Sequence, residues 1–456
     1  MFHFQKYSPK LYENIYTTEV GNYLLFFNSA FGKLAILGKE AQLFYQLING
    51  QRKIQDIFEL VKAEGQNMNF PEVIQIFEKL LKSGIIYFGK KNKIKPLSPS
   101  FIPKNLNVRI LITSQCNLRC AYCYLYKKIP QELREMSDEI LQKTIAQVIK
   151  NAKEHGFEKI TIKFSGGEPL LQFKKILNCL RKTRKLVKGK NLEINFGILT
   201  NGTLVTEKIA KVLKEKNILT TVSLDGLPEY HDAQRVFPDG SGSFKYVERG
   251  LKNLQEIQAP FDISVTITSK NMENLPDFTK YLLDYRSPFT FSFYRKTPFA
   301  NQELEINSKK LIYYLEQAYQ IIYNNPPSYK LIDRLLDRVN PERPRLYSCG
   351  VGRNFLIVRP DGKIVSCPMT FETPIGSVED KDLTKVIKRG DFTKGVSVEE
   401  RNLCRRCQWK YICGGGCPFL ALKQKGDYKD SSPYCEVYKA LIPEILKIEA
   451  KRLICY

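Results

Sequence analysis

The stretch ITSQCNLRCAYCYLY, residues 112–126, places three cysteines directly after an apolar run. Cys116, Cys120 and Cys123 follow the spacing C-x3-C-x2-C, which chance alone produces about 1% of the time in a chain with 12 cysteines. In a chain that is not secreted, clustered cysteines bind metal more often than they form disulfides. Three thiolates in one loop can hold three irons of a 4Fe–4S cluster and leave the fourth iron open. The alternative is a zinc site completed by a distant residue.

A second cysteine-rich stretch lies near the C-terminal end of the chain. CRRCQWKYICGGGC, residues 404–417, reads C-x2-C-x5-C-x3-C, with a chance expectation of about 0.02%. The sequence from about residue 345 onward shows little apolar periodicity. We therefore expect metal binding to supply stability to this region.

Strands and helices are predicted to alternate between residue 105 and about residue 300. The alternation indicates β/α units on a parallel sheet, either a partial barrel or an open sheet. The first strand ends just before Cys116, so the cysteine loop is expected at the carboxyl ends of the strands, where such folds place their active groups. The predicted strands are 107–113, 159–164, 192–200, 218–224, 261–268 and 288–294.

Residues 1–90 are predicted to form a small unit of their own. Two short apolar runs flank a hairpin signal at residues 28–31, and three helical patterns follow. Helices bracketed by small strands indicate a winged-helix arrangement. Residues 91–104 are charged and proline-rich, which is typical of a linker.

The bulk composition favours a cytoplasmic protein. The chain begins MFHFQKYSPK, without a signal-peptide pattern, and no apolar run approaches the roughly 18 residues of a spanning helix. The net charge of +24 indicates either an anionic partner, such as an acidic peptide, or a lysine-rich solvated surface. Because the lysines are spread along the chain, we expect no nucleic-acid partner and no membrane partner.

The motif CNLRCAYCY resembles the signature of radical SAM enzymes. In that family the three cysteines hold a 4Fe–4S cluster, and S-adenosylmethionine (SAM) binds the fourth iron. A reducing electron donor supplies the electron that cleaves SAM to a 5′-deoxyadenosyl radical, which abstracts a substrate hydrogen. The aromatic residue before the last cysteine, here Tyr122, lies against the adenine in this resemblance.

Further SAM contacts follow from the same resemblance. The turn SGGEP, after the second predicted strand, is similar to the family's glycine-rich motif that contacts the amino group of SAM. Gly166 and Gly167 allow close backbone approach, and Glu168 offers a carboxylate to the ammonium. Ser223 and Arg235 are candidates to hold the SAM carboxylate, because a guanidinium can pair both oxygens. An ordinary tight turn and an ordinary surface arginine are the alternatives.

The C-terminal cysteines resemble a second family module, the SPASM domain, at all seven of its cysteine positions. This resemblance implies two auxiliary 4Fe–4S clusters, which makes three clusters in the whole chain. Two such clusters have eight iron sites, and seven cysteines are available to bind them. Because no eighth cysteine lies between Cys349 and Cys367, we predict an open or substrate-ligated iron on the first auxiliary cluster. Cys179 and Cys455 fit neither motif. Carried over by resemblance, the first set of ligands is Cys349, Cys367 and Cys417, and the second is Cys404, Cys407, Cys413 and Cys435.

The predicted fold class is α/β: a partial (β/α)6 barrel with a small N-terminal winged-helix-like domain and a Cys-rich C-terminal cluster-binding domain. The predicted domains are a peptide-recognition domain over 1–90, a linker over 91–104, the radical SAM barrel over 105–310, a helical connection over 311–344 and the SPASM domain over 345–456.

The resemblances imply a radical SAM peptide maturase. The N-terminal unit is similar to the elements that bind the leader segment of ribosomally made precursor peptides, and the expected product is a thioether or a carbon–carbon crosslink. One alternative is an anaerobic sulfatase-maturating enzyme that oxidises Cys or Ser to formylglycine. Another is a zinc-stabilised binding protein without catalytic activity. The sequence indicates no general base.

Overall fold

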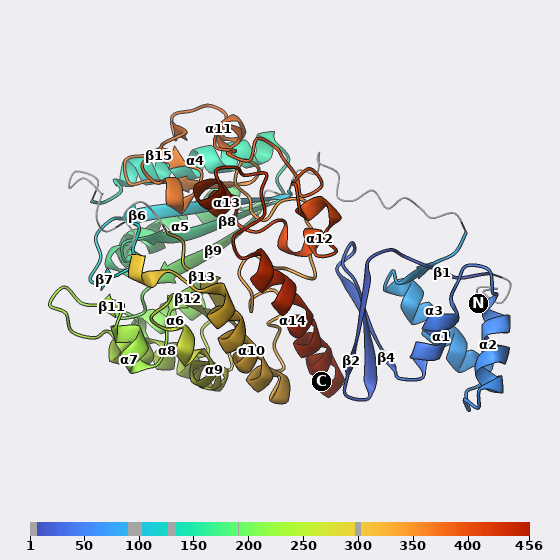
Figure 1. Ribbon diagram of the computed structural model, residues 1–456. Coiled ribbons are helices and arrows are strands. Elements are labelled where there is room, and N and C mark those ends of the chain that lie inside the picture. Colours follow the sequence, from blue (N-terminus) through green and yellow to red (C-terminus); the bar gives the residue numbers. More distant parts are fainter. Residues whose placement is uncertain (1–6, 90–102, 126–133, 190, 297–301) are drawn as a thin grey trace.

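The computed structural model describes residues 7–89, 103–125, 134–189, 191–296 and 302–456 (Figure 1). Most of the predicted linker, residues 91–102, lies outside the described residues. Within the described part of the chain, no helix has both the length and the apolar character needed to cross a membrane.

Six parallel strands form the centre of the molecule, and they are neighbours in chain order. This arrangement confirms the α/β fold with a partial barrel. The observed bounds lie within two residues of the predicted ones. The strands are β6 (Asn105–Thr113), β8 (Lys159–Gly166), β9 (Glu193–Thr200), β10 (Leu219–Ser223), β12 (Phe261–Ile267) and β13 (Phe289–Phe293).

Helices cover the outer face of this sheet because alternate strand residues are apolar on that side. In β8, Ile160, Ile162 and Phe164 are fully buried against the helices, whereas Lys163 points to the concave side with the opposite parity. The covering helices are α4 (Asp138–Glu154), α5 (Phe173–Val187), α6 (Glu207–Glu215), α7 (Pro228–Asp232), α8 (Phe244–Ile257), α9 (Leu275–Asp284) and α10 (Ser308–Asn324).

The C-terminal region extends the same sheet. β14 (Phe355–Val358) pairs parallel with β6, and β15 (Lys363–Val365) and β16 (Gly376–Ser377) continue antiparallel from it. The last helix, α14 (Cys435–Cys455), packs against α10. The region therefore has an apolar core that the sequence did not predict. α14 is apolar on several sides, and this weakens its helical periodicity. The other helices here are α11 (Leu383–Arg389), α12 (Lys410–Cys413) and α13 (Pro418–Lys425).

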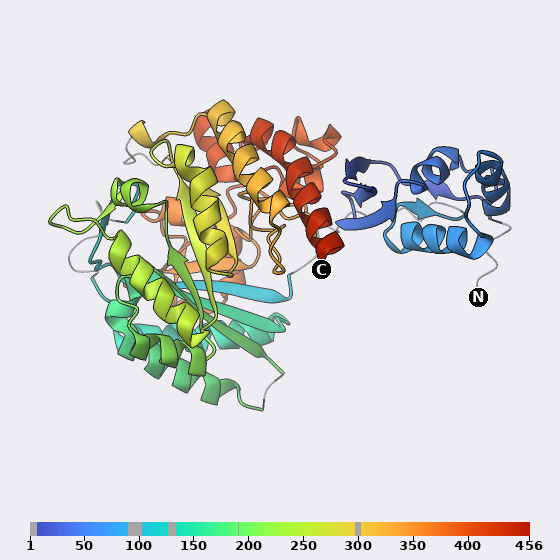
Figure 2. The same cartoon turned by 90° about the horizontal axis from the view of Figure 1, so that it is seen from below.

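The N-terminal domain is a three-stranded antiparallel sheet followed by three helices. One face of the sheet, including Phe26, packs on these helices, and the other face, including Phe27, packs on the main body. Figure 2 shows the domain as a separate lobe beside the C-terminal end of α14. The elements are β2 (Ile15–Val20), β3 (Tyr23–Asn28), β4 (Lys33–Gly38), α1 (Ala41–Leu47), α2 (Ile54–Ala63) and α3 (Phe70–Lys82), with β1 (Lys10–Leu11) paired to β5 (Ile86–Tyr87).

Candidate active site

The loop that carries Cys116, Cys120 and Cys123, here called the cysteine loop, lies at the carboxyl end of β6. Its short strand β7 (Arg119–Cys120) pairs antiparallel with β11 (Arg235–Val236), so Cys120 lies opposite Arg235. The backbone N–H of Ala121 also donates to the Gln234 carbonyl at 2.8 Å. The loop is thereby held against the segment that follows β10.

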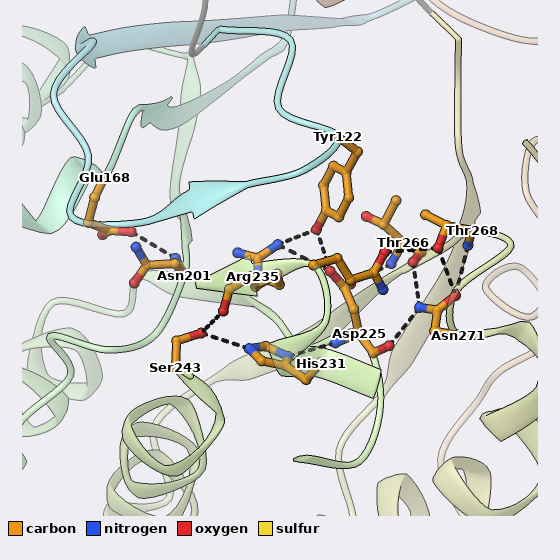
Figure 3. A network of polar contacts seen from close by, with 11 residues as sticks. Tyr122, Glu168, Asn201, Asp225, His231, Arg235, Ser243, Thr266, Thr268 and Asn271 are labelled. Atoms are coloured by element: carbon orange, nitrogen blue, oxygen red, sulfur yellow. Dashed lines mark hydrogen bonds and ion pairs between the residues drawn. The ribbon is translucent and has the colours of Figure 1, made fainter. Parts of the chain in front are cut away.

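Tyr122, Asp225 and Arg235 form a buried polar group beneath this loop (Figure 3). The Tyr122 hydroxyl donates to Asp225 Oδ2, and Arg235 Nη1 donates to both of these atoms. Asp225 is completely buried and Arg235 is 6% exposed, so the ion pair is shielded from water. Burial raises the pKa of Tyr122 well above its usual value, although the Arg235 charge opposes this. The tyrosine is therefore a neutral donor.

A second layer of hydrogen bonds orients this group (Figure 3). The Asp225 N–H donates to Nδ1 of His231 at 3.2 Å, so the proton of the neutral imidazole is on Nε2 and points to Ser243 Oγ at 3.0 Å. Ser243 in turn donates to the Arg235 carbonyl at 2.7 Å. Burial lowers the pKa of His231 well below its usual value, which keeps the ring neutral. Asn271 donates to the Asp225 carbonyl at 2.6 Å.

Glu168 is completely buried and connects two strand ends. Its Oε1 accepts from Thr200 Oγ1 at 2.6 Å and from the Leu170 N–H at 3.0 Å, and its Oε2 accepts from the Asn201 N–H at 2.7 Å. Burial raises the pKa of Glu168, and these hydrogen bonds oppose the rise. The Glu168 carboxylate thus forms hydrogen bonds within the protein. Its expected contact with the SAM ammonium stays a prediction.

Gly166 and Gly167 are required by the close approach of two protein segments. A Cβ on Gly166, whose φ is +139°, would lie 2.0 Å from the Thr113 carbonyl oxygen, and one on Gly167 would lie 2.0 Å from that of Gln115. The two glycines thus allow the SGGEP turn to contact the start of the cysteine loop. Their predicted role of letting the backbone approach a ligand closely stays a prediction.

A cavity of about 590 Å³ collects nearly all the predicted SAM-contacting residues. Glu168 does not line it. Asn201, which the sequence analysis did not single out, lines the wall near Cys116, and its Nδ2 is 3.9 Å from the Cys116 sulfur. The predicted residues that line this cavity are Cys116, Cys120, Tyr122, Cys123, Gly166, Gly167, Ser223 and Arg235.

The donor set of this cavity suits an iron–sulfur cluster. Burial, opposed by the Arg235 charge and aided by the neighbouring Cys123 and Cys116, raises the pKa of Cys120 to about 12. The Leu118 N–H donates to the Cys116 sulfur at 3.4 Å. Neighbouring thiols that are protonated in the metal-free protein become thiolates when a cationic metal group binds to them. Among the described residues, no three Cys, His, Asp or Glu side chains could hold a single metal ion.

The structure brings the other seven motif cysteines together in the two predicted sets, here called the Cys349 set and the Cys404 set. Burial raises the pKa of Cys367 to about 11, and Cys417 and Cys349 are the cysteines that add to the rise. Burial likewise raises the pKa of Cys413 to about 12, and there the contributing thiols are Cys404, Cys407 and Cys435. The role of each cysteine as a ligand stays a prediction. Cys179 is buried in α5, and Cys455 is exposed.

A larger cavity, of about 850 Å³, lies between the barrel and the C-terminal region, and the Cys349 set lines it. Tyr124, the residue after Cys123, lines both cavities. Burial raises the pKa of the Tyr124 hydroxyl, and the nearby charge of Arg109 in β6 opposes this. Tyr124 therefore separates the cysteine loop from the Cys349 set.

Comparison with known proteins identifies the family to which the domains around these two cavities belong. Residues 110–282 match the radical SAM superfamily, and residues 349–408 match the iron–sulfur cluster-binding SPASM domain. The chain belongs to the radical SAM superfamily. It is an enzyme, and its radical SAM and SPASM domains bind SAM and iron–sulfur clusters. This membership excludes the zinc-stabilised binding protein.

Three individual proteins illustrate the likeness of this radical SAM enzyme to others. The cysteine-type anaerobic sulfatase-maturating enzyme of Clostridium perfringens is 26% identical over 72% of the chain and 92% of its own length. The radical SAM cyclopropyl synthase TigE of Paramaledivibacter caminithermalis is 23% identical over 93% of the chain and 92% of its own length. The structure of Streptococcus suis SuiB bound to precursor peptide SuiA shares the fold, with a TM-score of 0.52, 18% identity and coverage of 94% of this chain and 100% of SuiB.

The sequence pointed to two turns at strand ends but did not single out Asn201 and Asp225 within them as site residues. Both lie in turns at strand ends, TNGT after β9 and SLDG after β10. Neighbouring parallel strands end at one edge of the sheet, so polar residues in these turns were a signal of a shared site. It was weak, because Asn-Gly and Asp-Gly are ordinary turn sequences.

Proposed function

We propose that this radical SAM enzyme is a peptide maturase. It abstracts a hydrogen from a ribosomally made precursor peptide and closes a thioether or carbon–carbon crosslink. The observation that supports this most is the N-terminal domain, whose sheet has an open edge suited to an added peptide strand. Bound at the cysteine loop, a 4Fe–4S cluster with SAM supplies the 5′-deoxyadenosyl radical.

The residues of the cysteine-loop cavity bind and orient. Arg235 and Ser223 face the same cavity as the three thiols, where a guanidinium and a hydroxyl suit the SAM carboxylate. Asp225 keeps Arg235 charged and its side chain ordered, since the ion pair is buried. The larger cavity beyond Tyr124 has room for peptide residues between the cysteine loop and the Cys349 set.

Strand addition needs unpaired backbone groups on β4. Among the described strands, β4 pairs with β3 alone. The Leu34 carbonyl accepts from Ser83 Oγ at 3.0 Å, so it points away from β3. By the alternation of an antiparallel pair, the N–H and C=O of Ile36 point the same way. These groups can pair with an extended peptide that lies between β4 and α3.

The charge of the chain suits an acidic leader segment. Lys33 lies at the start of β4, and Lys79 and Lys82 lie in the last turn of α3. These lysines adjoin the open edge, and the whole chain has a net charge of +24. Opposite charge on a peptide would speed its association and fix its direction.

The likeness to other proteins supports a whole-chain role of this kind. TigE and SuiB each align with more than 90% of the chain, whereas the sulfatase-maturating enzyme aligns with 72% of it. SuiB has been solved with a precursor peptide. A peptide with a leader segment is therefore the partner that we propose for this chain.

The direct test is anaerobic co-expression of the enzyme with short reading frames encoded beside its gene, followed by peptide mass spectrometry. A loss of two hydrogens localised between two residues would establish the crosslink and name the substrate. An unchanged mass with deuterium incorporated from heavy water would replace crosslinking by epimerisation. An unmodified peptide, with no deuterium uptake, would contradict the proposal.

Strand addition has its own matched pair of variants. Ile36→Pro removes the outward N–H without touching the hydrogen bonds between β4 and β3, whereas Ile36→Ala loses the side chain and keeps the N–H. We expect the proline variant to weaken leader binding at least tenfold more than the alanine variant, with SAM cleavage unchanged in both. Equal affinity of the two variants would exclude pairing at this edge.

A second candidate function is sulfatase maturation, which the 26% identity to the Clostridium perfringens enzyme favours. The test is co-expression with a sulfatase under the same anaerobic conditions. Formylglycine in the sulfatase, together with no modified precursor peptide, would replace the first proposal by this one.

A further inference from the structure

Arginines gather around the Cys349 set from different parts of the chain. Arg295 follows β13, contacts the Cys417 thiol and pairs with Asp337 at 2.6 Å. Arg338 and Arg345 come from the segment after α10, and both line the large cavity with Cys349. Burial and the Arg295 charge lower the pKa of Arg338, but nearby Asp337, Cys417 and Cys349 outweigh them and raise it.

These arginines hold hydrogen-bond donors that the described chain leaves without a partner. The buried Nε atoms of Arg295, Arg338 and Arg345 have none, and neither has the hydroxyl of Ser348 beside Cys349. A buried donor without an acceptor costs about 1–3 kcal/mol, so native proteins rarely keep one. Several such donors in one place point to acceptor atoms that the polypeptide does not itself supply.

Carboxylates cannot be the missing acceptors. Asp337 is already paired with Arg295, and it lies 3.9 Å from Arg338 Nε. Arg345 forms no ion pair with any carboxylate of the described residues; its Nη2 donates to the Arg338 carbonyl at 2.6 Å. The sulfur atoms of a cluster held by the Cys349 set would be anionic acceptors at this place. This step rests on the ligand assignment of the proposed function.

The Cys404 set has a different electrostatic setting. Its lysine neighbours, Lys425 and Lys439, are exposed, and water and salt screen exposed charges. Among the described arginines, Arg401 and Arg345 are buried near that set, and both also lie near Cys349. The four thiolates of the Cys404 set would also carry one more negative charge than the three thiolates of the Cys349 set. Both differences favour the uptake of an electron at the Cys349 set.

We propose that Arg295, Arg338 and Arg345, with the Ser348 hydroxyl, give the cluster of the Cys349 set the higher reduction potential of the two auxiliary clusters. Hydrogen bonds to sulfur and nearby positive charge both stabilise the reduced form. When a crosslink closes, two hydrogens leave the peptide. One leaves as an atom to the 5′-deoxyadenosyl radical, and the other leaves as a proton and one electron. A cluster held by the Cys349 set would accept that one electron, and the peptide would thereby be oxidised.

The test is potentiometric EPR on the full-length, anaerobically purified enzyme. Cys116, Cys120 and Cys123 are replaced by Ala so that only the two auxiliary clusters titrate. In this background we expect Arg338→Met and Arg345→Met each to make reduction of one cluster at least tenfold less favourable, about 59 mV for a one-electron couple. The other cluster should keep its potential in Arg338→Met and should shift less than the first in Arg345→Met, because Arg345 also lies near Cys413. Arg338→Lys, which keeps the charge, should recover part of the loss.

Two further variants complete the design. Arg353→Met removes an arginine of the same cavity whose Nε, unlike those of Arg295, Arg338 and Arg345, is not among the buried donors without a partner, so both potentials should stay unchanged. Ser348→Ala removes an unpaired hydroxyl without changing charge or fold, and a smaller shift in the same direction is expected. Unchanged potentials in Ser348→Ala and in both methionine variants would overturn the proposal.

Failure of the ligand assignment gives a different result. Cys349→Ala should abolish the EPR signal whose potential the arginine variants shift. If both auxiliary signals persist in Cys349→Ala, the assignment of this set fails, and with it the cluster arrangement of the proposed function. If the signal is lost but the arginine variants have no effect, only the inference about the arginines fails.

Discussion

The ring of Trp409 meets the ring of Tyr16 edge to face, with centroids 5.3 Å apart and planes inclined at 61°. Trp409 lies between Cys407 and Cys413 of the Cys404 set, and Tyr16 lies in β2 of the N-terminal domain. Phe27 of β3 is the second ring against the indole, with centroids 6.3 Å apart. The domain proposed to bind a leader therefore touches a cluster-binding loop directly.

This contact predicts a fluorescence signal. Trp409 is the only tryptophan in the chain and is 3% exposed. Tyr16→Ala opens the indole to water, so we expect its emission maximum to move to longer wavelength, with a loss of about 0.5–1.5 kcal/mol of stability. Tyr23→Ala, at an exposed position of the same sheet, is the control and should leave the emission unchanged. An unshifted emission in Tyr16→Ala would contradict the packing of the two domains.

The buried ion pair predicts a large effect of Asp225→Asn. The variant leaves Arg235 buried without a counter-charge, and breaking a buried pair in this way costs about 3–5 kcal/mol. Thermal unfolding under anaerobic conditions measures the loss. A double variant that adds Arg235→Met should recover part of the stability, because the stranded charge is gone.

The control for Asp225→Asn is Asp239→Asn, on an exposed turn where the carboxylate accepts from Ser241. Its melting temperature should equal that of the wild type. If Asp225→Asn also melted like the wild type, Asp225 and Arg235 would not form a buried pair in solution.

The cysteine sets predict iron contents. Three 4Fe–4S clusters correspond to about twelve irons per chain. Cys123→Ala should retain about eight irons and lose SAM cleavage, because the cysteine loop can no longer complete its cluster. Cys455→Ala removes an exposed cysteine outside the sets and should keep both the iron and the cleavage. Production of 5′-deoxyadenosine by Cys123→Ala would contradict the assignment of the cysteine loop.

The sequence predicted those parts of the fold that local patterns determine. The six barrel strands are short segments rich in apolar residues between turn residues, a composition typical of buried parallel strands. The cysteine spacing predicted the loop at the end of β6. In contrast, the contact of Tyr122 with Asp225 and Arg235 depends on β7 meeting β11. The paired residues of these two strands, Cys120 and Arg235, are 115 residues apart. No local pattern reports such a contact.

The arginines around the Cys349 set could not be predicted for the same reason. Arg295 follows β13, Arg338 and Arg345 follow α10, and each is an ordinary arginine in its local sequence. Glu168 shows the opposite case. The sequence singled it out for a contact with SAM, which stays a prediction, and the structure gives it hydrogen bonds within the protein that the motif alone did not indicate.

The last prediction separates these two roles of Glu168. In Glu168→Gln the amide group replaces one acceptor oxygen, so Thr200 or the Asn201 N–H loses its partner, at about 1–3 kcal/mol for a buried donor. If the carboxylate serves only the protein, the melting temperature falls and SAM affinity in the folded enzyme changes little. If it also meets the SAM ammonium, the dissociation constant of SAM rises at least tenfold as well, because a charge-assisted hydrogen bond is lost. Anaerobic calorimetric titration with SAM and thermal unfolding, compared with the exposed control Glu256→Gln, distinguish the two outcomes.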